Sequence, residues 1–529
     1  MKDKCNDSSR FHGVWEKTAL GEILIESKEK SAPGSNPEKK YVGLEHIKKD
    51  HGVLQGYGSS TGIRSSKNVF SKGDLLYGKL RPYLNKVAIP DFDGVCSTDI
   101  LVFKKQSHLS HGFIKYRLLC RDFVNYAQLN ISGVHHPRIH KKFIDKFSVF
   151  LPPLPEQFEI VRKIEELFSE LGNGIESLKK AREQLKTYRQ AVLKHAFEGK
   201  LTQEWRARQA AAGSPPESAE KLLERIREER EEHYKKQVED WKKACEQAKA
   251  EGRKKPVKPK KPKNLPPVTK EELSELPELP EGWQWVRLGN VIKEIFDGPY
   301  GTNLKTKDYV EDGVRVIRLE NIGVLDFIEA KRSYISEEKY NLLKQHKVSY
   351  GDIIFSSFIS DQIRVAILPN YIKRAINKAD CFCIRVSDFY LFKKYMAFYL
   401  STQSCYSQLV HQVHGATRPR VNTTQLKNCC IPLCSHQEQS EISYELESRL
   451  SVCDQLEQSI EDSLGKAESL RQSILKKAFS GELTQQWREE NPELISGENS
   501  AELLLERIQT EKKKVGAKEK NRAGKKKTT

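Results

Sequence analysis

The sequence has 529 residues, enough for three or four domains with hydrophobic cores of their own. Its 90 lysine and arginine residues outnumber 72 aspartate and glutamate residues, and the net charge of +18 indicates a polyanionic partner. The N-terminal MKDKCNDSSR lacks an apolar core, and no stretch approaches about 18 consecutive apolar residues. We therefore expect a cytoplasmic protein without a membrane segment.

One block of the sequence occurs twice. Leu193–Arg206 reads LKHAFEGKLTQEWR and Leu475–Arg488 reads LKKAFSGELTQQWR, a shift of 282 residues. The same shift aligns Glu156-Gln157 with Glu438-Gln439. A register kept over this length indicates an internal duplication, so the fold should consist of two copies of one unit.

Between these marks the apolar residues follow a heptad pattern, which predicts two long helices. One series is Ile164, Leu171, Leu178, Leu185 and Val192, and the other is Phe168, Ile175, Arg182, Tyr188 and Ala196. Because the second copy keeps the pattern, we expect the two helices to pair as a coiled coil. Copies related by a twofold axis would make it antiparallel. The alternative is that each apolar stripe packs on its own neighbouring domain.

The stretches before the two helices are rich in short β-strand patterns. Residues 11–150 hold such runs between Gly, Asp and Pro turns, followed by a helical stretch at Gly112–Val124. Residues 283–430 repeat the framework, as Lys72–Tyr77 and Tyr350–Phe355 show, while the segments between framework positions differ. We expect two copies of one α+β domain that carry different surfaces.

The linking segments have their own signals. Ser214-Pro215-Pro216-Glu217 is typical of a capping box, and it predicts a charged helix that ends near Ala250. Lys254–Pro267 is rich in lysine and proline, and we expect an extended tether there.

Signals for catalysis and metal binding are weak. Asp297-Gly298-Pro299-Tyr300 resembles the Asp-Pro-Pro-Tyr signature of adenine methyltransferases, but glycine replaces the first proline, and a turn accounts for it. No phosphate-binding loop ending in Gly-Lys-Ser/Thr occurs. The eleven cysteines fit reduced thiols, and the clusters at Cys381–Cys383 and Cys429–Cys434 lack zinc-ligand spacing. We expect no catalytic residue, no metal and no cofactor on this chain.

Three features together resemble the specificity subunit of type I restriction–modification enzymes. They are the C-terminal ILKKAFSGELTQQWREENPELISGENSAELL, the Pro-Leu-Pro-Glu-Gln at Pro153–Gln157, and the repeated order of head and helix. The resemblance implies an α+β fold with two similar target recognition domains, separated by two long helices that form an antiparallel coiled coil with pseudo-twofold repetition. The implied boundaries are 11–151 and 282–431 for the target recognition domains, 152–250 and 432–511 for the helical regions, 251–281 for the linker, and 512–529 for a disordered basic tail.

The resemblance also implies partners. They are double-stranded DNA, two adenine-N6 methyltransferase subunits that carry S-adenosylmethionine, and two restriction subunits that use ATP and Mg²⁺ for translocation. The chain itself would be non-catalytic and would bind a two-part DNA site, with a gap set by the helices. A helix over residues 156–198 would be roughly 65 Å long at about 1.5 Å per residue, which suits two segments of duplex rather than one small ligand. The rival hypothesis is a two-headed adaptor that joins proteins, without sequence-specific DNA binding.

Candidates for DNA contact come from the segments around the repeated framework. Guanidinium groups read guanine, amides read adenine, and lysine grips phosphate, whereas the alternative for each residue is a solvated surface position. The candidates are Lys79, Arg81, Tyr83, Asn85, Lys86, His135, His136 and Arg138 in the first domain, and Ser357, Gln362, Arg364, Gln412, His414, Arg418 and Arg420 in the second. The repeat keeps Arg138 and Arg420, which favours phosphate contact or structural pairing over base choice.

Overall fold

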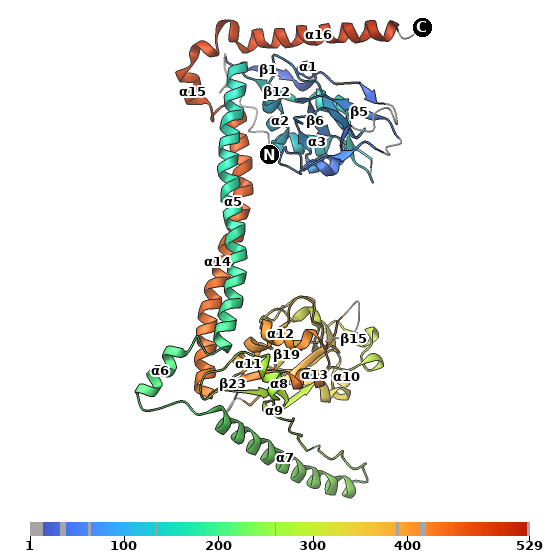
Figure 1. Ribbon diagram of the computed structural model, residues 1–529. Helices are drawn as coiled ribbons and strands as arrows, with labels where there is room; N and C mark the ends of the chain where they lie inside the picture. The colour runs from blue at the N-terminus through green and yellow to red at the C-terminus, as the bar shows by residue number, and fades with distance from the viewer. Residues whose placement is uncertain are drawn as a thin grey trace. The chain divides into compact units, whose positions relative to one another are not determined.

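The computed structural model describes residues 14–31, 39–61, 65–133, 135–259, 261–387, 391–412 and 419–525. The chain divides into two compact units, Met1–Lys180 with Ile460–Thr529, and Ala181–Ser459. Each unit contains one β-rich head and a segment of each long helix, α5 (Leu154–Phe197) and α14 (His436–Phe479) (Figure 1). None of the described helices is both long and apolar enough to cross a membrane.

The first head contains a five-stranded sheet, a three-stranded sheet and a short pair of strands that joins its ends. β1 (Glu16–Ala19) pairs antiparallel with β12 (Ser148–Leu151), so the strand that enters the head lies beside the strand that leaves it. The larger sheet has the order β2-β5-β8-β3-β4 and the smaller one β7-β6-β9. Their bounds are Lys30–Ser31, Lys67–Phe70, Gly94–Cys96, Lys40–Val42 and Gly58–Ser59, then Val87–Ala88, Leu75–Gly78 and Ile100–Phe103.

One helical stretch was expected in this head at Gly112–Val124, and the structure has two helices instead. α2 (His111–Leu119) and α3 (Arg121–Leu129) meet at Cys120, whose ψ of 142° is extended. A residue in that conformation cannot continue the helix, so the chain changes direction there. Both helices bury aromatic residues in the core of the first head, among them Phe113 and Phe123.

The second head repeats this plan. β13 (Gln284–Arg287) pairs antiparallel with β23 (Cys430–Leu433), and the sheets have the orders β15-β17-β16-β21-β18 and β14-β22-β19-β20. In each large sheet one pair is parallel, β3 with β8 and β16 with β21. The bounds are Tyr309–Val310, Tyr334–Ile335, Val314–Ile317, Ala375–Asn377 and Lys347–Val348, then Glu294–Phe296, Cys381–Arg385, Ile353–Ser356 and Val365–Ile367. The predicted pair of similar α+β domains is confirmed.

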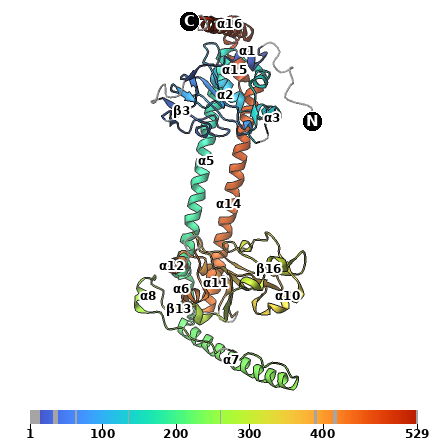
Figure 2. The ribbon, with the colours of Figure 1, turned by 90° about the vertical axis from the view of Figure 1, so that its right-hand side faces the viewer.

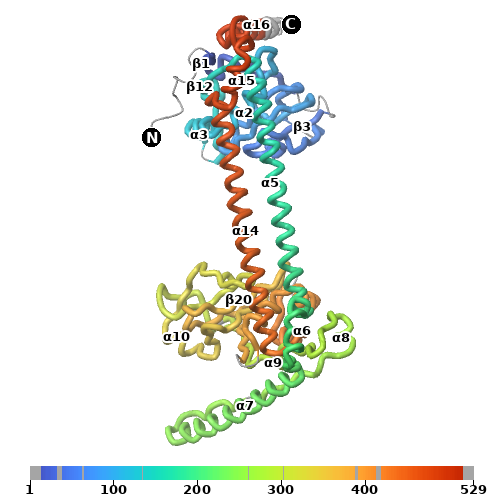
Figure 3. The backbone as a smooth tube through the Cα atoms, turned by 90° about the vertical axis from the view of Figure 1, so that its left-hand side faces the viewer, coloured from blue at the N-terminus to red at the C-terminus, as the bar shows by residue number. Residues whose placement is uncertain are grey.

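Helices α5 and α14 lie side by side in each unit, as Figures 2 and 3 show. In the first unit the start of α5 contacts the chain after the end of α14, and in the second unit the reverse holds. The helices are therefore antiparallel, as a twofold relation between the two copies predicted. The expectation for Tyr188 was wrong, because its side chain is 44% exposed. Arg189 occupies the seam instead, and its guanidinium donates to Asp454 and Glu457.

A buried carboxylate in each unit explains the repeated block. Glu156, fully buried, accepts hydrogen bonds from Trp15 Nε1 at 2.8 Å, from Thr484 Oγ1 at 2.7 Å and from the Arg488 guanidinium. The threonine and the arginine come from the LTQQWR segment that follows α14. Because that segment belongs to the other copy of the repeat, the carboxylate ties the beginning of one long helix to the end of the other. We call this group of four side chains a clasp.

The second unit contains the same clasp around Glu438. Glu438 accepts from Trp283 Nε1 at 2.9 Å, from Thr202 Oγ1 at 2.7 Å and from the Arg206 guanidinium. The glycine of each block, Gly199 or Gly481, has φ near +70°, which turns the chain back toward the carboxylate. The block is thus repeated because each copy holds the helix start of the other.

The glutamines that follow these glutamates hold each helix to its own head. Gln157 accepts from the Ser110 backbone N–H at 3.0 Å and donates to the Pro152 carbonyl at 2.9 Å. Gln439 makes the equivalent contacts with Phe392 and Cys434, each at 2.9 Å. In each Glu-Gln pair, the glutamate therefore binds the segment that follows the other long helix, and the glutamine binds the head of its own copy.

The charged helix α7 (Ala219–Ala250) begins later than expected. Its N-cap is Ser218, whose hydroxyl accepts from the Lys221 backbone N–H, and not Ser214. Ser214 lies before the helix, because the cap nearest the buried Ala219 satisfies the free N–H groups of the first turn. The copy of this helix is α16 (Ala501–Lys525).

We expect Glu156→Ala or Glu438→Ala to destabilise the fold by about 3 kcal/mol or more, because each leaves a largely buried guanidinium without its carboxylate. The control is Glu166→Ala on α5, whose ion pair with Arg162 is exposed on both sides and should contribute under about 1 kcal/mol. Thermal unfolding followed by circular dichroism gives the comparison. Equal shifts for clasp and control variants would contradict the role of the clasp.

Candidate nucleic-acid interface

The structure brings together the two sets of candidate residues in the first head. The segment after β6 crosses β11 (Arg138–Ile139), where Leu80 and Arg138 form an antiparallel bridge. The Arg81 N–H donates to the Pro137 carbonyl at 2.7 Å, and the Ile139 N–H donates to the Lys79 carbonyl at 3.0 Å. Two segments about sixty residues apart in the chain thus present their side chains at one place.

The second head has the same crossing. Phe358 and Arg420 form the bridge, the Ile359 N–H donates to the Pro419 carbonyl at 3.2 Å, and the Val421 N–H donates to the Ser357 carbonyl at 3.0 Å. The duplication has kept the backbone geometry of the crossing. We call each of these places a strand crossing.

An arginine–aspartate pair holds each strand crossing. Arg138 Nε and Nη2 donate to the two carboxylate oxygens of Asp99 at 2.9 and 3.1 Å, and hydrogen bonding from Arg138 holds the pKa of Asp99 below its ordinary value. In the second head Arg420 Nη1 lies 3.6 Å from Asp380 Oδ1, and its guanidinium lies over the Phe358 ring. Structural pairing therefore accounts for the preservation of Arg138 and Arg420.

Four candidates are wholly or partly buried within their heads. Asn85 is 1% exposed and closes a 3₁₀ turn with φ +39°. Ser357, also 1% exposed, donates to Asp380 Oδ1. Lys86 donates to the Leu44 carbonyl, and Arg364 makes the same contact with the Leu319 carbonyl in the second head. Lys86 and Arg364 therefore hold backbone segments, and Asn85 and Ser357 present almost no surface to a ligand.

The other candidates keep a surface position or lie outside the described residues. Arg81, Tyr83, His135, His136, Gln362 and Gln412 are exposed and Lys79 is half-buried, whereas His414 and Arg418 lie outside the described residues. The surface of the first strand crossing is thus cationic and aromatic. Position by position in the repeat, Ile359 and Asp361 replace Arg81 and Tyr83 in the second head. Since the framework is shared and these side chains differ, the two heads offer different chemistry to a ligand.

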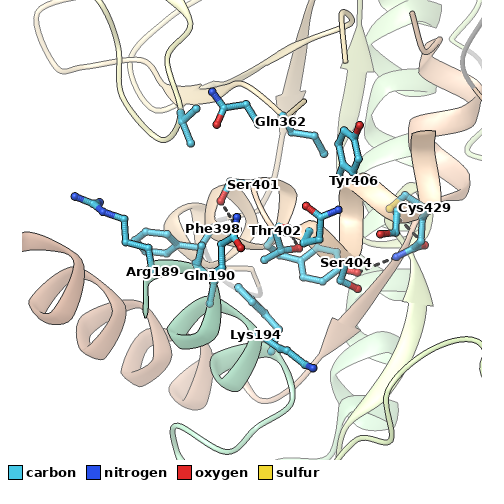
Figure 4. Close-up of a pocket in the computed structure, with 18 of the residues that line it drawn as sticks. Arg189, Gln190, Lys194, Gln362, Phe398, Ser401, Thr402, Ser404, Tyr406 and Cys429 are labelled. Carbon is cyan, nitrogen blue, oxygen red and sulfur yellow. Dashed lines mark hydrogen bonds between the residues drawn. The ribbon is translucent and has the colours of Figure 1, made fainter. Parts of the chain in front are cut away.

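A cavity in the second unit, of about 1710 Å³, was not foreseen from the sequence. Figure 4 shows Arg189, Gln190 and Lys194 from α5 on one side and Gln362 on the other, with Ser404 of α12 (Gln403–Val410) between them. Acidic residues such as Asp361 and Asp454 also line it. The mixed charge does not suit a polyanion alone. The heptad pattern reported only on apolar packing, so it gave no signal for the polar residues of α5 that line this cavity.

The Asp-Gly-Pro-Tyr segment forms local hydrogen bonds. Asp297 accepts from the Gly298 N–H at 2.7 Å and from the Tyr300 hydroxyl. A side chain at Gly298 would collide with the Lys378 backbone, which explains the glycine. The described residues contain no group of three or more His, Cys, Asp or Glu side chains that could hold a metal ion.

Similarity to known proteins identifies the family. The family model of the type I restriction modification DNA specificity domain matches residues 13–184 and 280–466, one head with adjoining helix in each range. The chain therefore belongs to this family.

Individual relatives are specificity subunits of the same class of enzymes. The EcoBI specificity subunit of Escherichia coli is 28% identical over 404 residues, which cover 76% of this chain and 72% of that subunit. The EcoDI specificity subunit of Escherichia coli is 36% identical over 208 residues, 39% of this chain and 46% of that subunit. The chain thus spans about half of the EcoDI subunit it matches.

Solved structures share the fold. A chain from a structure concerning complex assembly and conformational transition of the type I R-M system aligns with a TM-score of 0.63 at 20% identity, covering 88% of this chain and 98% of that chain. The HsdS subunit of Thermoanaerobacter tengcongensis aligns with a TM-score of 0.51 at 20% identity, covering 89% and 97%.

Asp99→Asn should lower the free energy of unfolding at pH 7 by about 1 kcal/mol, because it removes a partly exposed charge pair. The pKa of Asp99 is lowered in the folded state, so its contribution is present above the unfolded-state pKa of about 3.9. That contribution disappears as the pH falls through the lower folded-state value. Urea unfolding should show wild type and variant converging as the pH falls from about 4 to about 2. The exposed Asp91→Asn is the control, and an undiminished Asp99→Asn difference at low pH would contradict this role.

Proposed function

We propose that this chain reads a two-part DNA sequence, with one part bound by each head, and thereby directs the modification and restriction of DNA by partner subunits. Membership of the specificity family supports DNA as the ligand. The observation that carries the two-part target is the repeated strand crossing, in which the Arg–Asp pair is kept while the exposed side chains differ. One scaffold with two surfaces suits two different base sequences.

Partner subunits would carry out the modification and restriction of DNA, and this chain would recognise the DNA site. Two methyltransferase subunits would carry S-adenosylmethionine and modify adenine at N6, and two restriction subunits would use ATP and Mg²⁺. The sequence contains no phosphate-binding loop of its own. The chain would select the site and hold the partners there.

The exposed side chains at the strand crossings would choose the bases. Arg81 can donate two hydrogen bonds to guanine, and Gln362 can pair with adenine through its amide. Tyr83, which is 41% exposed, offers a ring that can pack against bases or sugars. Arg138 and Arg420, already paired with aspartates, would contribute positive charge toward phosphates and keep the segments in place.

Methylated adenines should be mapped in DNA exposed to the enzyme assembled with its methyltransferase subunits. We expect one two-part motif with an unspecified gap. Arg81→Ala should relax or weaken the first part only, and Gln362→Ala the second part only, each by about 1–3 kcal/mol of discrimination. The two variants are controls for each other, because the head that is not mutated should keep its half of the motif. A continuous motif, or a change in both halves from one variant, would contradict the proposal.

A further inference from the structure

The second unit carries an arm that the recognition of bases does not use. Helix α7 docks on the second head through its first turns, where Ala219, Leu222 and Ile226 are buried and the Arg230 guanidinium donates to the Asn290 carbonyl. Beyond these turns the helix continues to Ala250, and the following lysine- and proline-rich segment returns beside it (Figure 1). The arm is therefore a hairpin of one helix and one extended strap.

The strap, which the sequence predicted to be an extended tether, contacts the helix along its course. Trp241 Nε1 donates to the Pro256 carbonyl at 2.8 Å, and the ammonium groups of Lys255 and Lys258 lie 5.0 and 5.8 Å from the Trp241 ring centroid. Lys261 Nζ lies 3.0 Å from Glu231 Oε1. Proline restricts the strap to an extended form, so little entropy is lost when it lies on the helix.

Positive charge is concentrated in the end of helix α7 and in the strap that returns beside it. Residues 242–263 contain ten lysine and arginine residues and two glutamates, whereas residues 219–241 contain six basic and eight acidic residues. A segment of 22 residues thus supplies a net +8, close to half of the net +18 of the whole chain. We call residues 242–263 the basic tip.

The composition of the basic tip indicates phosphate rather than protein as its partner. Nine of its ten cationic residues are lysine, and the described ones are exposed. Val257 is its one large apolar side chain that is strongly exposed in the described part of the tip. Protein interfaces are poor in lysine and depend on buried aromatic or arginine anchors, and Trp241 is already used by the strap. Lysine acts as a point charge toward phosphate and does not require a shaped site.

The duplicated helix supports the same interpretation independently. Helix α16 docks on the first head through Ala501, Leu504 and Ile508, which are buried like their counterparts in α7. Lys512 still donates to the Gly21 carbonyl, and the part beyond it, residues 513–525, has six lysine and arginine residues and one glutamate. The two copies differ in sequence but share an excess of positive charge after the docked turns.

We propose that the basic tip binds the phosphate backbone of duplex DNA outside the base pairs that the two heads read. This inference rests on the proposed function as a DNA reader. The basic tip adds affinity that depends on salt and on the length of flanking DNA, and it adds no sequence preference.

The test uses the full-length chain assembled with its methyltransferase subunits, and duplexes that carry the mapped motif with short or long flanks. Lys243, Lys249, Lys254 and Lys263 are changed together to glutamine. With long flanks, the slope of log Kd against log salt concentration should fall by about 3 to 4, because each phosphate that a lysine neutralises contributes roughly 0.9 to that slope. Affinity near 0.15 M salt should fall by about tenfold or more, and the methylated motif should stay the same.

The matched control changes the same four lysines to arginine, which keeps the charge and should keep the wild-type slope. An unchanged slope in the glutamine variant, with the two-part motif intact, would overturn the inference and leave the proposed function standing. Loss of partner-subunit binding at an unchanged slope would also overturn it, because the basic tip would then be a protein-docking surface. Absence of any two-part motif in the wild type would instead refute the proposed function.

Discussion

The rest of the structure depends on the hydrogen bonds that two buried glutamates, Glu156 and Glu438, accept. A carboxylate taken out of water is costly unless several donors compensate it, and each of these accepts hydrogen bonds from a tryptophan, a threonine and an arginine. The threonine and the arginine come from the far end of the other copy of the repeat. Neither unit can therefore be completed by a continuous stretch of chain, and the antiparallel pairing of α5 with α14 follows from the clasps.

The duplication separates positions that must stay the same from positions that can change. Each copy keeps the Glu-Gln pair and the strand crossing. It also keeps a cationic side chain, Lys86 or Arg364, that donates to the carbonyl of Leu44 or Leu319. The exposed side chains at the strand crossings and the strap on α7 have diverged. A scaffold fixed from within can therefore change its target without loss of stability, since substitutions at exposed positions seldom exceed about 0.5 kcal/mol.

The sequence predicted the duplication, the paired helices and the two α+β heads, because periodicity and repeat register report directly on which positions are buried. It failed where one side chain must be distinguished from its neighbour. The apolar character of Tyr188 favoured it for the series, yet the charge pair with Asp454 and Glu457 places Arg189 in the seam. Asn85, Lys86 and Arg364 have the composition of a binding loop, but distant carbonyl groups and a left-handed turn determine their positions. The Lys/Pro segment was predicted to be an extended tether, and no local pattern reveals its contact with Trp241.

If the proposed function is right, the paired helices set the spacing between two separately read half-sites. The most direct measurement removes one heptad from each helix, residues 176–182 of α5 and the repeat-equivalent residues 458–464 of α14, which keeps the seam in phase. Methylated adenines are then mapped with the assembled enzyme. We predict the same two half-sequences with a shorter gap between them. The same two half-sequences with an unchanged gap would contradict the claim that the helices set the spacing.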